Sequence, residues 1–218
     1  MCKNGWNQIL DSPITNKILH FLEREYKNNI PIFPTQENVF NAFKECAYKD
    51  LRVVMLGQDP YPQPGYATGL LFANPVGTEE LSPSLKLVID RIYKDFYLTE
   101  PEKFHFDITM KKWAHQGILL LNSALTVVAN TPTSHSNLWF PFIKDMLVKL
   151  SRDASGIIYL LIGAYAKLFE PFINHNTNYV LCYKHPAYFA RTNSEFECDG
   201  FLKTNEILSK NNGLTIEF

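Results

Sequence analysis

Three short apolar runs of this 218-residue chain are each followed by a polar side chain of a different kind: Asp59, Asn122 and His185. One carboxylate and one imidazole, without a set of metal ligands, suit the activation of water and the stabilisation of a cationic centre. The amide of Asn122 offers a hydrogen-bond donor and an acceptor together, so it can read the edge of an amide-like ring. An aromatic platform would complete a site for such a ring, and Phe72 lies shortly after Asp59.

These residues can act together only if the fold brings them together, and the apolar runs predict such a fold. Runs rich in branched residues at 51–56, 117–121, 156–162 and 179–183 are typical of buried strands. Helical spacing between them predicts a parallel sheet covered on both faces. We therefore expect an α/β fold in a single domain, 1–218, with a central four-stranded, mainly parallel sheet flanked by helices and a mostly helical N-terminal part, 1–50. The helical stretches are predicted at 18–26, 35–44, 84–96, 140–151, 165–172 and 203–209.

Ligands of open parallel sheets bind beyond the carboxyl ends of the strands, where Asp59, Asn122 and His185 would converge. A structural interpretation stands beside this one, because an Asp or Asn after a strand is often a turn former or a helix cap. The residues alone leave both interpretations open. The chain has no GxSxG motif, which disfavours a serine-hydrolase site, and the lack of GxxxxGKS/T and GxGxxG leaves the use of ATP or a dinucleotide unsupported.

The composition is that of a folded domain with almost no net charge. Lys and Arg number 21 against 22 Asp and Glu, and 46% of the residues are hydrophobic, which excludes a disordered chain. A near-neutral total argues at first against a nucleic-acid partner, since such domains usually carry a basic excess. No window of 18 residues is apolar throughout, and the N-terminus lacks an apolar signal core. We therefore expect no membrane partner and a cytoplasmic location, or the nucleus or a viral replication site for a virus of eukaryotes.

The cysteines are scattered along the chain, without the close pairs that bind zinc. In a reducing compartment such cysteines remain free thiols. We therefore expect neither disulfides nor a structural metal site. The residues concerned are Cys2, Cys46, Cys182 and Cys198.

Short motifs spread from about residue 32 to residue 208 match those of one known family in order and spacing. They are GQDPY at 57–61, PSL at 83–85, WAHQG at 113–117, LLLN at 119–122, NSALTV at 122–127, HP at 185–186 and KTNE at 203–206. Each motif alone is weak, but together they are highly specific: the chain strongly resembles the family 1 uracil-DNA glycosylases. The resemblance implies that family's fold and hydrolysis of the N-glycosidic bond between uracil and deoxyribose in DNA. It also implies a monomer that needs no cofactor or metal, and DNA-mimicking inhibitor proteins as a further class of partner.

Applied residue by residue, the resemblance implies roles for the polar side chains. Asp59 would orient or activate the attacking water and stabilise the oxocarbenium-like sugar. His185, as a neutral imidazole, would donate to uracil O2, with the backbone N–H of Gln58 near the same oxygen. Asn122 would pair with uracil O4 and N3–H, which excludes cytosine because cytosine presents the opposite donor and acceptor pattern there.

Aromatic side chains would form the rest of the uracil pocket. Tyr61 would pack against uracil C5 and leave no room for the methyl group of thymine, and Phe72 would stack on the ring. Either ring could instead be an ordinary part of the core. Pro62 departs from the family, since many members have a histidine there that helps to hold the catalytic water. Backbone carbonyls near Asp59 would then hold this water, and we still expect an active enzyme.

The family flips its target nucleotide out of the duplex, and a bulky apolar residue fills the vacated space. In the segment 185–190, Phe189 stands where the family usually has leucine, so we expect Phe189 to be this wedge, beside Tyr188. The alternative is that these rings pack back onto the protein.

Phosphate contacts would come from both sides of this loop. Pro83-Ser84 resembles the family's proline–serine loop, whereas alanines stand at Ala164, Ala187 and Ala190, where the family has serines. Backbone N–H groups would then bind phosphate at these places. The near-neutral total charge predicts modest non-specific DNA affinity that salt easily removes. The cations expected to form a local positive rim are Lys184 and Arg191, with Lys167 nearby.

Two other functions stay open on the sequence. The first is a family member of low activity that acts mainly as a DNA-binding replication accessory, and the intact Asp59, Asn122 and His185 argue against it. The second is a relative specific for another damaged base. Tyr61 together with Asn122 argues for uracil, because one blocks a 5-methyl group and the other reads the imide edge. Uracil-containing DNA, single- or double-stranded, is the expected substrate.

Overall fold

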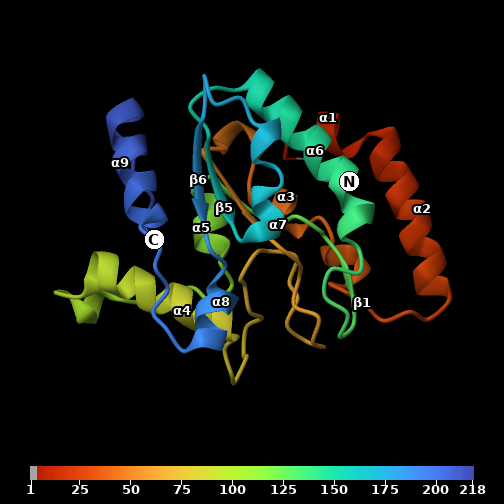
Figure 1. Cartoon of the computed structure of the whole chain (residues 1–218), viewed down its shortest axis with the longest axis horizontal. Coiled ribbons are helices and arrows are strands. Elements are labelled where there is room, and N and C mark those ends of the chain that lie inside the picture. Colours follow the sequence, from red (N-terminus) through yellow and green to blue (C-terminus); the bar gives the residue numbers. More distant parts are fainter. Residues whose placement is uncertain (1–3) are drawn as a thin grey trace.

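Helices and short strands alternate along most of the chain, of which the computed structural model describes residues 4–218 (Figure 1). The helices are α1 (Asn7–Leu10), α2 (Pro13–Lys27), α3 (Asn41–Glu45), α4 (Pro83–Ile92), α5 (Lys111–His115), α6 (Ser136–Asp153), α7 (Ala164–Lys167), α8 (Pro186–Thr192) and α9 (Gly200–Asn212). The strands are β1 (Ile32–Phe33), β2 (Val53–Gly57), β3 (Ile118–Asn122), β4 (Val127–Val128), β5 (Ile158–Ile162) and β6 (Tyr179–Tyr183). Short 3-10 turns occupy Gln36–Asn38, Tyr48–Asp50, Pro101–Lys103 and Glu170–Phe172, and a π-helical turn, Tyr93–Tyr97, follows α4.

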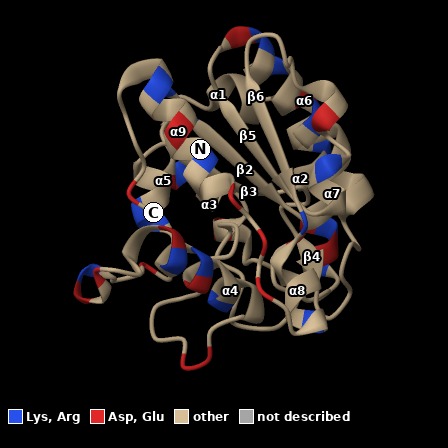
Figure 2. Ribbon diagram, turned by 60° about the vertical axis from the view of Figure 1, so that its left-hand side comes forward, with Lys and Arg blue, Asp and Glu red and all other residues tan. Residues whose placement is uncertain are grey.

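The four predicted strands form one parallel sheet in the order β3-β2-β5-β6. β2, β3 and β5 are buried along their whole length, which explains why their sequences are continuously apolar. α6 and α7 lie on one side of the sheet, and α5 and α9 lie on the other (Figure 1, Figure 2). A Cβ at Gly200 would lie 2.8 Å from side-chain atoms of Leu160 and Tyr183, so the start of α9 packs tightly on β5 and β6. The predicted α/β fold with helices on both faces is confirmed.

Several details differ from the prediction, including α8, which forms where no helix was predicted, and the stretch 165–172, which divides into α7 and a 3-10 turn. Burial on both faces fails for β6, an edge strand that exposes Tyr179 and Cys182, whereas the opposite edge strand, β3, is buried throughout. The helix predicted at 35–44 is interrupted where the chain segment 68–69 packs against it: the Asn41 amide donates to the Thr68 carbonyl at 2.9 Å. A short antiparallel ladder between β1 and β4 was not predicted, since two residues per strand leave no readable pattern.

The thiols and the charges complete this description. Cys46, Cys182 and Cys198 are free thiols, as expected, and the prediction for Cys2 lies outside the described residues. Within residues 4–218, no group of three or more His, Cys, Asp or Glu side chains is arranged to hold a metal ion. In the same part of the chain, no helix is both long and apolar enough to span a membrane. Basic and acidic residues are interspersed over the ribbon (Figure 2).

Candidate active site at the carboxyl edge of the sheet

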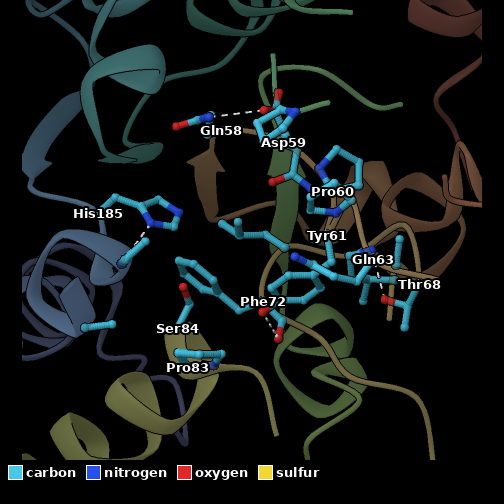
Figure 3. Close-up of a pocket in the computed structure, with 18 of the residues that line it drawn as sticks. Gln58, Asp59, Pro60, Tyr61, Gln63, Thr68, Phe72, Pro83, Ser84 and His185 are labelled. Atoms are coloured by element: carbon cyan, nitrogen blue, oxygen red, sulfur yellow. Dashed lines mark hydrogen bonds between the residues drawn. The ribbon is translucent and has the colours of Figure 1, made fainter. Parts of the chain in front are cut away.

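The segments that follow the four parallel strands meet at one edge of the sheet, between α8 and the start of α4 (Figure 1). A cavity of about 400 Å³ lies there. Of the predicted site residues, its walls contain Gln58, Asp59, Tyr61, Phe72, Pro83, Ser84, Asn122, His185, Ala187 and Arg191. Figure 3 shows side chains from the segment after β2, the start of α4 and the residue before α8 around this space. The fold therefore brings the carboxylate, the amide and the imidazole to one place.

Asp59 is held by hydrogen bonds at one of its two carboxylate oxygens. Oδ2 accepts hydrogen bonds from the backbone N–H of Thr133 at 2.7 Å and from the side chain of Gln58 at 3.1 Å (Figure 3). Oδ1 is buried and has no hydrogen-bond partner within residues 4–218. Burial raises the pKa of Asp59, and the two hydrogen bonds and the charge of His135 offset part of that rise. A buried carboxylate oxygen without a partner is a place for a water or ligand donor.

The turn that holds Asp59 was missed in the sequence. Thr133 has a φ of 68°, a left-handed conformation that a β-branched residue rarely adopts, and this conformation accompanies its bond to Asp59. The Ser134 hydroxyl accepts from the Val128 N–H at 2.9 Å, and the Pro62 carbonyl accepts from the Asn130 N–H at 3.0 Å. Pro62 therefore helps to fix the turn beside Asp59. Glycine or asparagine usually signals a positive φ, so nothing in the sequence marked Thr133.

Asn122 ends β3 directly opposite Gly57, the last residue of β2. A Cβ at Gly57 would lie 2.2 Å from Leu71 Cδ1 and 3.2 Å from Asn122 Oδ1, so a side chain here would displace Leu71 and crowd this amide. Oδ1 of Asn122 is buried and, within the described chain, has no hydrogen-bond partner. The adjacent Ser123 hydroxyl donates to the Gln58 carbonyl at 2.9 Å and ties the two strand ends together. Asp59, Asn122 and His185 form the part of the cavity that we call its floor. There, Asn122 presents a fixed acceptor to a bound ligand.

His185 follows β6 and caps the start of α8. Its Nδ1 accepts the Ala187 N–H at 3.1 Å, which places the proton of a neutral imidazole on Nε2. Burial, with a smaller contribution from the positive charge of Arg191, lowers the pKa of His185 to about 4. A Cβ at Gly163 would lie 3.0 Å from His185 Cβ, so this glycine gives the ring its place. The ring is therefore a neutral donor at pH 7.

Phe72 and Tyr61 are the aromatic walls of the cavity (Figure 3). The ring of Phe72 is buried and lies 5.5 Å from the ring of His185, tilted by 58°. The Tyr61 hydroxyl donates to the Phe72 carbonyl at 3.1 Å, so the two walls are linked. Burial raises the pKa of Tyr61 to about 12, which keeps its hydroxyl protonated.

The flipping loop differs from the prediction. Phe189 is only 4% exposed, and its ring lies 5.6 Å from that of Phe196, so in this structure it packs onto the protein, which is the alternative that the sequence left open, and does not project as a wedge. The reason is helical spacing, since Pro186 and Phe189 share the buried face of α8. Tyr188 is the exposed aromatic of this loop at 42%, and the Lys184 ammonium lies 4.5 Å from its ring centroid.

The remaining predicted rim residues lie around the cavity. Pro83 and Ser84 begin α4 and contribute to its wall, whereas Ala164 and Lys184 are exposed beyond it. Ala190, which also stands where the resemblance implies serine, lines the wall as well. The ion pairs formed within residues 4–218 include none made by Lys167, Lys184 or Arg191. Of these three side chains, Arg191 lines the cavity, while Lys184 immediately precedes His185 in the chain.

The match to known proteins covers nearly the whole chain. The family model described as the Uracil DNA glycosylase superfamily matches residues 43–209. A uracil-DNA glycosylase of Campylobacter jejuni is 35% identical over 220 residues, which cover 99% of this chain and 93% of that protein. The chain belongs to the uracil-DNA glycosylase superfamily.

Solved structures of this superfamily share the fold. The crystal structure of mimivirus uracil-DNA glycosylase superposes with a TM-score of 0.87 at 23% identity, covering 99% of this chain and 86% of that one. A variant of the mimivirus protein in complex with UGI gives a TM-score of 0.85 at 23% identity, covering 99% and 88%. At this identity the likeness concerns the fold, and the chemistry rests on the residues around the cavity.

Proposed function

We propose that this chain excises uracil from DNA as a glycosylase of the family 1 type and leaves an abasic site. Two buried acceptors without partners, Asp59 Oδ1 and Asn122 Oδ1, carry the proposal, because both belong to one cavity beside a neutral imidazole. A water would satisfy the first acceptor and the N3–H of uracil the second. Superfamily membership supports this activity, and the GQDPY and HP motifs, both in the cavity wall, support the family 1 type.

The reaction breaks the bond between C1′ of deoxyribose and N1 of uracil. The bonding electron pair leaves with the base, so negative charge grows at uracil O2. The Nε2–H of His185 and the backbone N–H of Gln58 stabilise that charge, as donors do in an oxyanion hole. The water oxygen bonds to C1′ and gives its proton to Asp59, whose negative charge also stabilises the cationic sugar. The products are free uracil and an abasic site.

The walls of the cavity select the base. Asn122 accepts from N3–H and donates to O4 of uracil, a pattern that cytosine reverses. Tyr61 lies against C5 and excludes the methyl group of thymine, and Phe72 stacks on the ring. Selection thus uses one side-chain amide and two aromatic faces.

DNA contacts involve the rim. Tyr188, and not the buried Phe189, fills the space left by the flipped nucleotide. Pro83-Ser84, Lys184, Arg191 and backbone N–H groups near Ala164 and Ala187 contact the phosphates. The same surface would bind DNA-mimicking inhibitors, as the UGI complex of the mimivirus relative suggests.

The test is the release of free base from oligonucleotides that differ at one position, which holds uracil, cytosine or thymine. We expect release of uracil alone, and equally in the presence of a chelator. Release of no base, or of cytosine or thymine at a comparable rate, would contradict the proposal. A duplex series with uracil opposite adenine or guanine then measures how much unpairing limits the rate.

A further inference from the structure

Behind Tyr61 lies a buried group of polar side chains to which the reaction assigns no role. The Tyr61 hydroxyl lies 2.6 Å from Ser82 Oγ as well as 3.1 Å from the Phe72 carbonyl. The Ser82 N–H donates to Asn74 Oδ1 at 2.9 Å, and Asn74 Nδ2 lies 3.4 Å from Ser82 Oγ. Asn74 and Ser82 are 0% and 5% exposed, and neither is part of the cavity wall. They therefore touch Tyr61 but not the base.

The donors and acceptors of this group determine the direction of each of its hydrogen bonds. Tyr61 donates its hydrogen to the Phe72 carbonyl, so the hydrogen of the Ser82 hydroxyl goes to the Tyr61 oxygen. Ser82 Oγ then accepts from the backbone N–H of Leu85 at 3.3 Å and from Asn74. Each polar group of the set has a partner in this arrangement. A buried polar network in which every group has a partner specifies one geometry, and here it fixes the position of the Tyr61 hydroxyl.

Ser82 and Asn74 belong to segments that are themselves fixed, one by helix α4 and the other by a backbone hydrogen bond. Ser82 is the N-cap of α4, whose first residues, Pro83 and Ser84, lie in the cavity wall. The backbone N–H of Asn74 donates to the Ile108 carbonyl at 2.8 Å. The Tyr61 hydroxyl is thus tied to the start of α4 on one side and to the segment 72–74 on the other.

Space lies beside Tyr61 into which its ring could otherwise move. A second cavity of about 250 Å³ is lined by Tyr61, Tyr66 and Ser82, among others. The rings of Tyr61 and Tyr66 lie 6.1 Å apart at an interplanar angle of 68°, an edge contact rather than a stacked one. Packing alone leaves Tyr61 room to withdraw, and the hydrogen bonds to its hydroxyl oppose that movement.

We propose that Ser82 and Asn74 are positioning residues that hold Tyr61 against the C5 edge of the base and so set the discrimination between uracil and 5-substituted pyrimidines. The inference rests on the proposed function, in which Tyr61 lies beside uracil C5. Without the Ser82 hydroxyl, Tyr61 withdraws toward the second cavity and a substituent at C5 is accommodated. Specificity in this protein then depends on a buried serine that the base never touches.

The experiment compares kcat/KM for 5-bromouracil and for uracil in the same single-stranded oligonucleotide. Bromine improves the leaving base equally for every variant, so a change in the ratio reports on space at C5. Ser82→Ala removes the proposed tether but also an α4 cap. Ser12→Ala is the matched control, since Ser12 caps α2 in the same way, followed by Pro13 and accepting from the Thr15 N–H at 3.1 Å.

We expect Ser82→Ala to raise the 5-bromouracil to uracil ratio about tenfold, while Ser12→Ala leaves it within about twofold of wild type. Both variants lose a helix cap, so both lower the melting temperature. Tyr61→Phe, which keeps both caps, also raises the ratio, and the double variant Tyr61→Phe with Ser82→Ala raises it no further.

An unchanged ratio in Ser82→Ala, with uracil still released, would overturn the inference and leave the proposed function intact. If Ser82→Ala does not fold, Tyr61→Phe decides alone, and an unchanged ratio there overturns the inference as well. A wild type that releases no uracil overturns the proposed function and with it this inference. The 5-bromouracil to uracil ratio therefore tests the inference, and the wild-type rate of uracil release tests the proposed function.

Discussion

The floor of the cavity and its rim are built by different means. On the floor, Asp59, Asn122 and His185 follow or end strands of the sheet, and backbone groups hold Asp59 and His185. At the rim, Tyr188 and Lys184 are exposed side chains on and beside the short helix α8. The groups proposed for chemistry are therefore held in place in the DNA-free protein, whereas those proposed for DNA contact lie on an exposed surface.

The departures from the family pattern follow the same division. The alanines Ala164, Ala187 and Ala190 belong to the rim, as does Phe189, which has turned inward onto Phe196. The one departure on the floor is Pro62, whose carbonyl accepts a hydrogen bond within the turn that holds Asp59. We infer that the groups for the reaction are retained while the contacts with DNA have changed. Separate variants test the floor and the rim of the cavity.

The largest effect is expected on the floor, from Asp59→Asn. The substitution removes the negative charge that faces the sugar and the acceptor for the proton of water, so the rate of uracil release falls about a thousandfold. Single-turnover kinetics on a single-stranded oligonucleotide measure it, and the melting temperature serves as the control for folding. A loss of less than about tenfold would remove Asp59 from the mechanism.

Asn122→Asp tests recognition on the same floor. A carboxylate cannot donate to uracil O4, and it brings a second buried charge beside Asp59, so kcat/KM for uracil falls about a hundredfold. The comparison of uracil with cytosine in one oligonucleotide checks whether the imide edge is what Asn122 reads. Uracil excision at the wild-type rate would show that it is not.

The rim is tested by a neighbouring pair, Tyr188→Ala and Phe189→Ala. Tyr188→Ala should lower kcat/KM about tenfold on duplex DNA and leave single-stranded DNA nearly unaffected, because only the duplex needs the vacated space filled. Phe189→Ala should instead reduce the free energy of unfolding by about 3–5 kcal/mol, as expected for a buried aromatic. Denaturant unfolding and duplex kinetics on both variants separate the roles, and the reversed pattern would restore Phe189 as the wedge.

The smallest effect is expected from Ala187→Ser, which gives the rim back one hydroxyl donor. One added hydrogen bond to a phosphate should tighten duplex binding about threefold to tenfold. Binding is measured on an uncleavable duplex over a range of salt concentrations. Equal affinity of variant and wild type would mean that backbone N–H groups already satisfy that phosphate.

Much of the floor could be predicted from the sequence, because it depends on strands and their ends. Four apolar runs gave the sheet, and the residues after them gave Asp59, Asn122 and His185, which now line one cavity. Parallel strands end at one edge whatever else the chain does, so this inference needs only the strands and their direction.

Features that depend on side-chain direction could not be predicted. Phe189 matches the family position of a wedge, but its placement depends on the register of α8, which a motif does not reveal. The hydrogen bond from Thr133 to Asp59 depends on a left-handed backbone conformation at Thr133, which this residue type does not predict. Ser82-Pro83 has the residue types of a helix start, but the helix was predicted only from residue 84, and the bond of Ser82 to Tyr61 joins segments 21 residues apart.

An ionised Asp59 and a neutral His185 must act together in this mechanism, and the pH dependence of single-turnover uracil release is the decisive measurement. Burial raises the pKa of Asp59 above its usual value of 3.8, and the pKa of His185 is lowered to about 4. Because the ionised Asp59 is the active form, the rate should rise with pH through a single acid limb above pH 3.8 and then stay level through pH 6.5. A rate that falls as pH rises through about 6.5 would show that a protonated histidine is needed, and it would contradict the account.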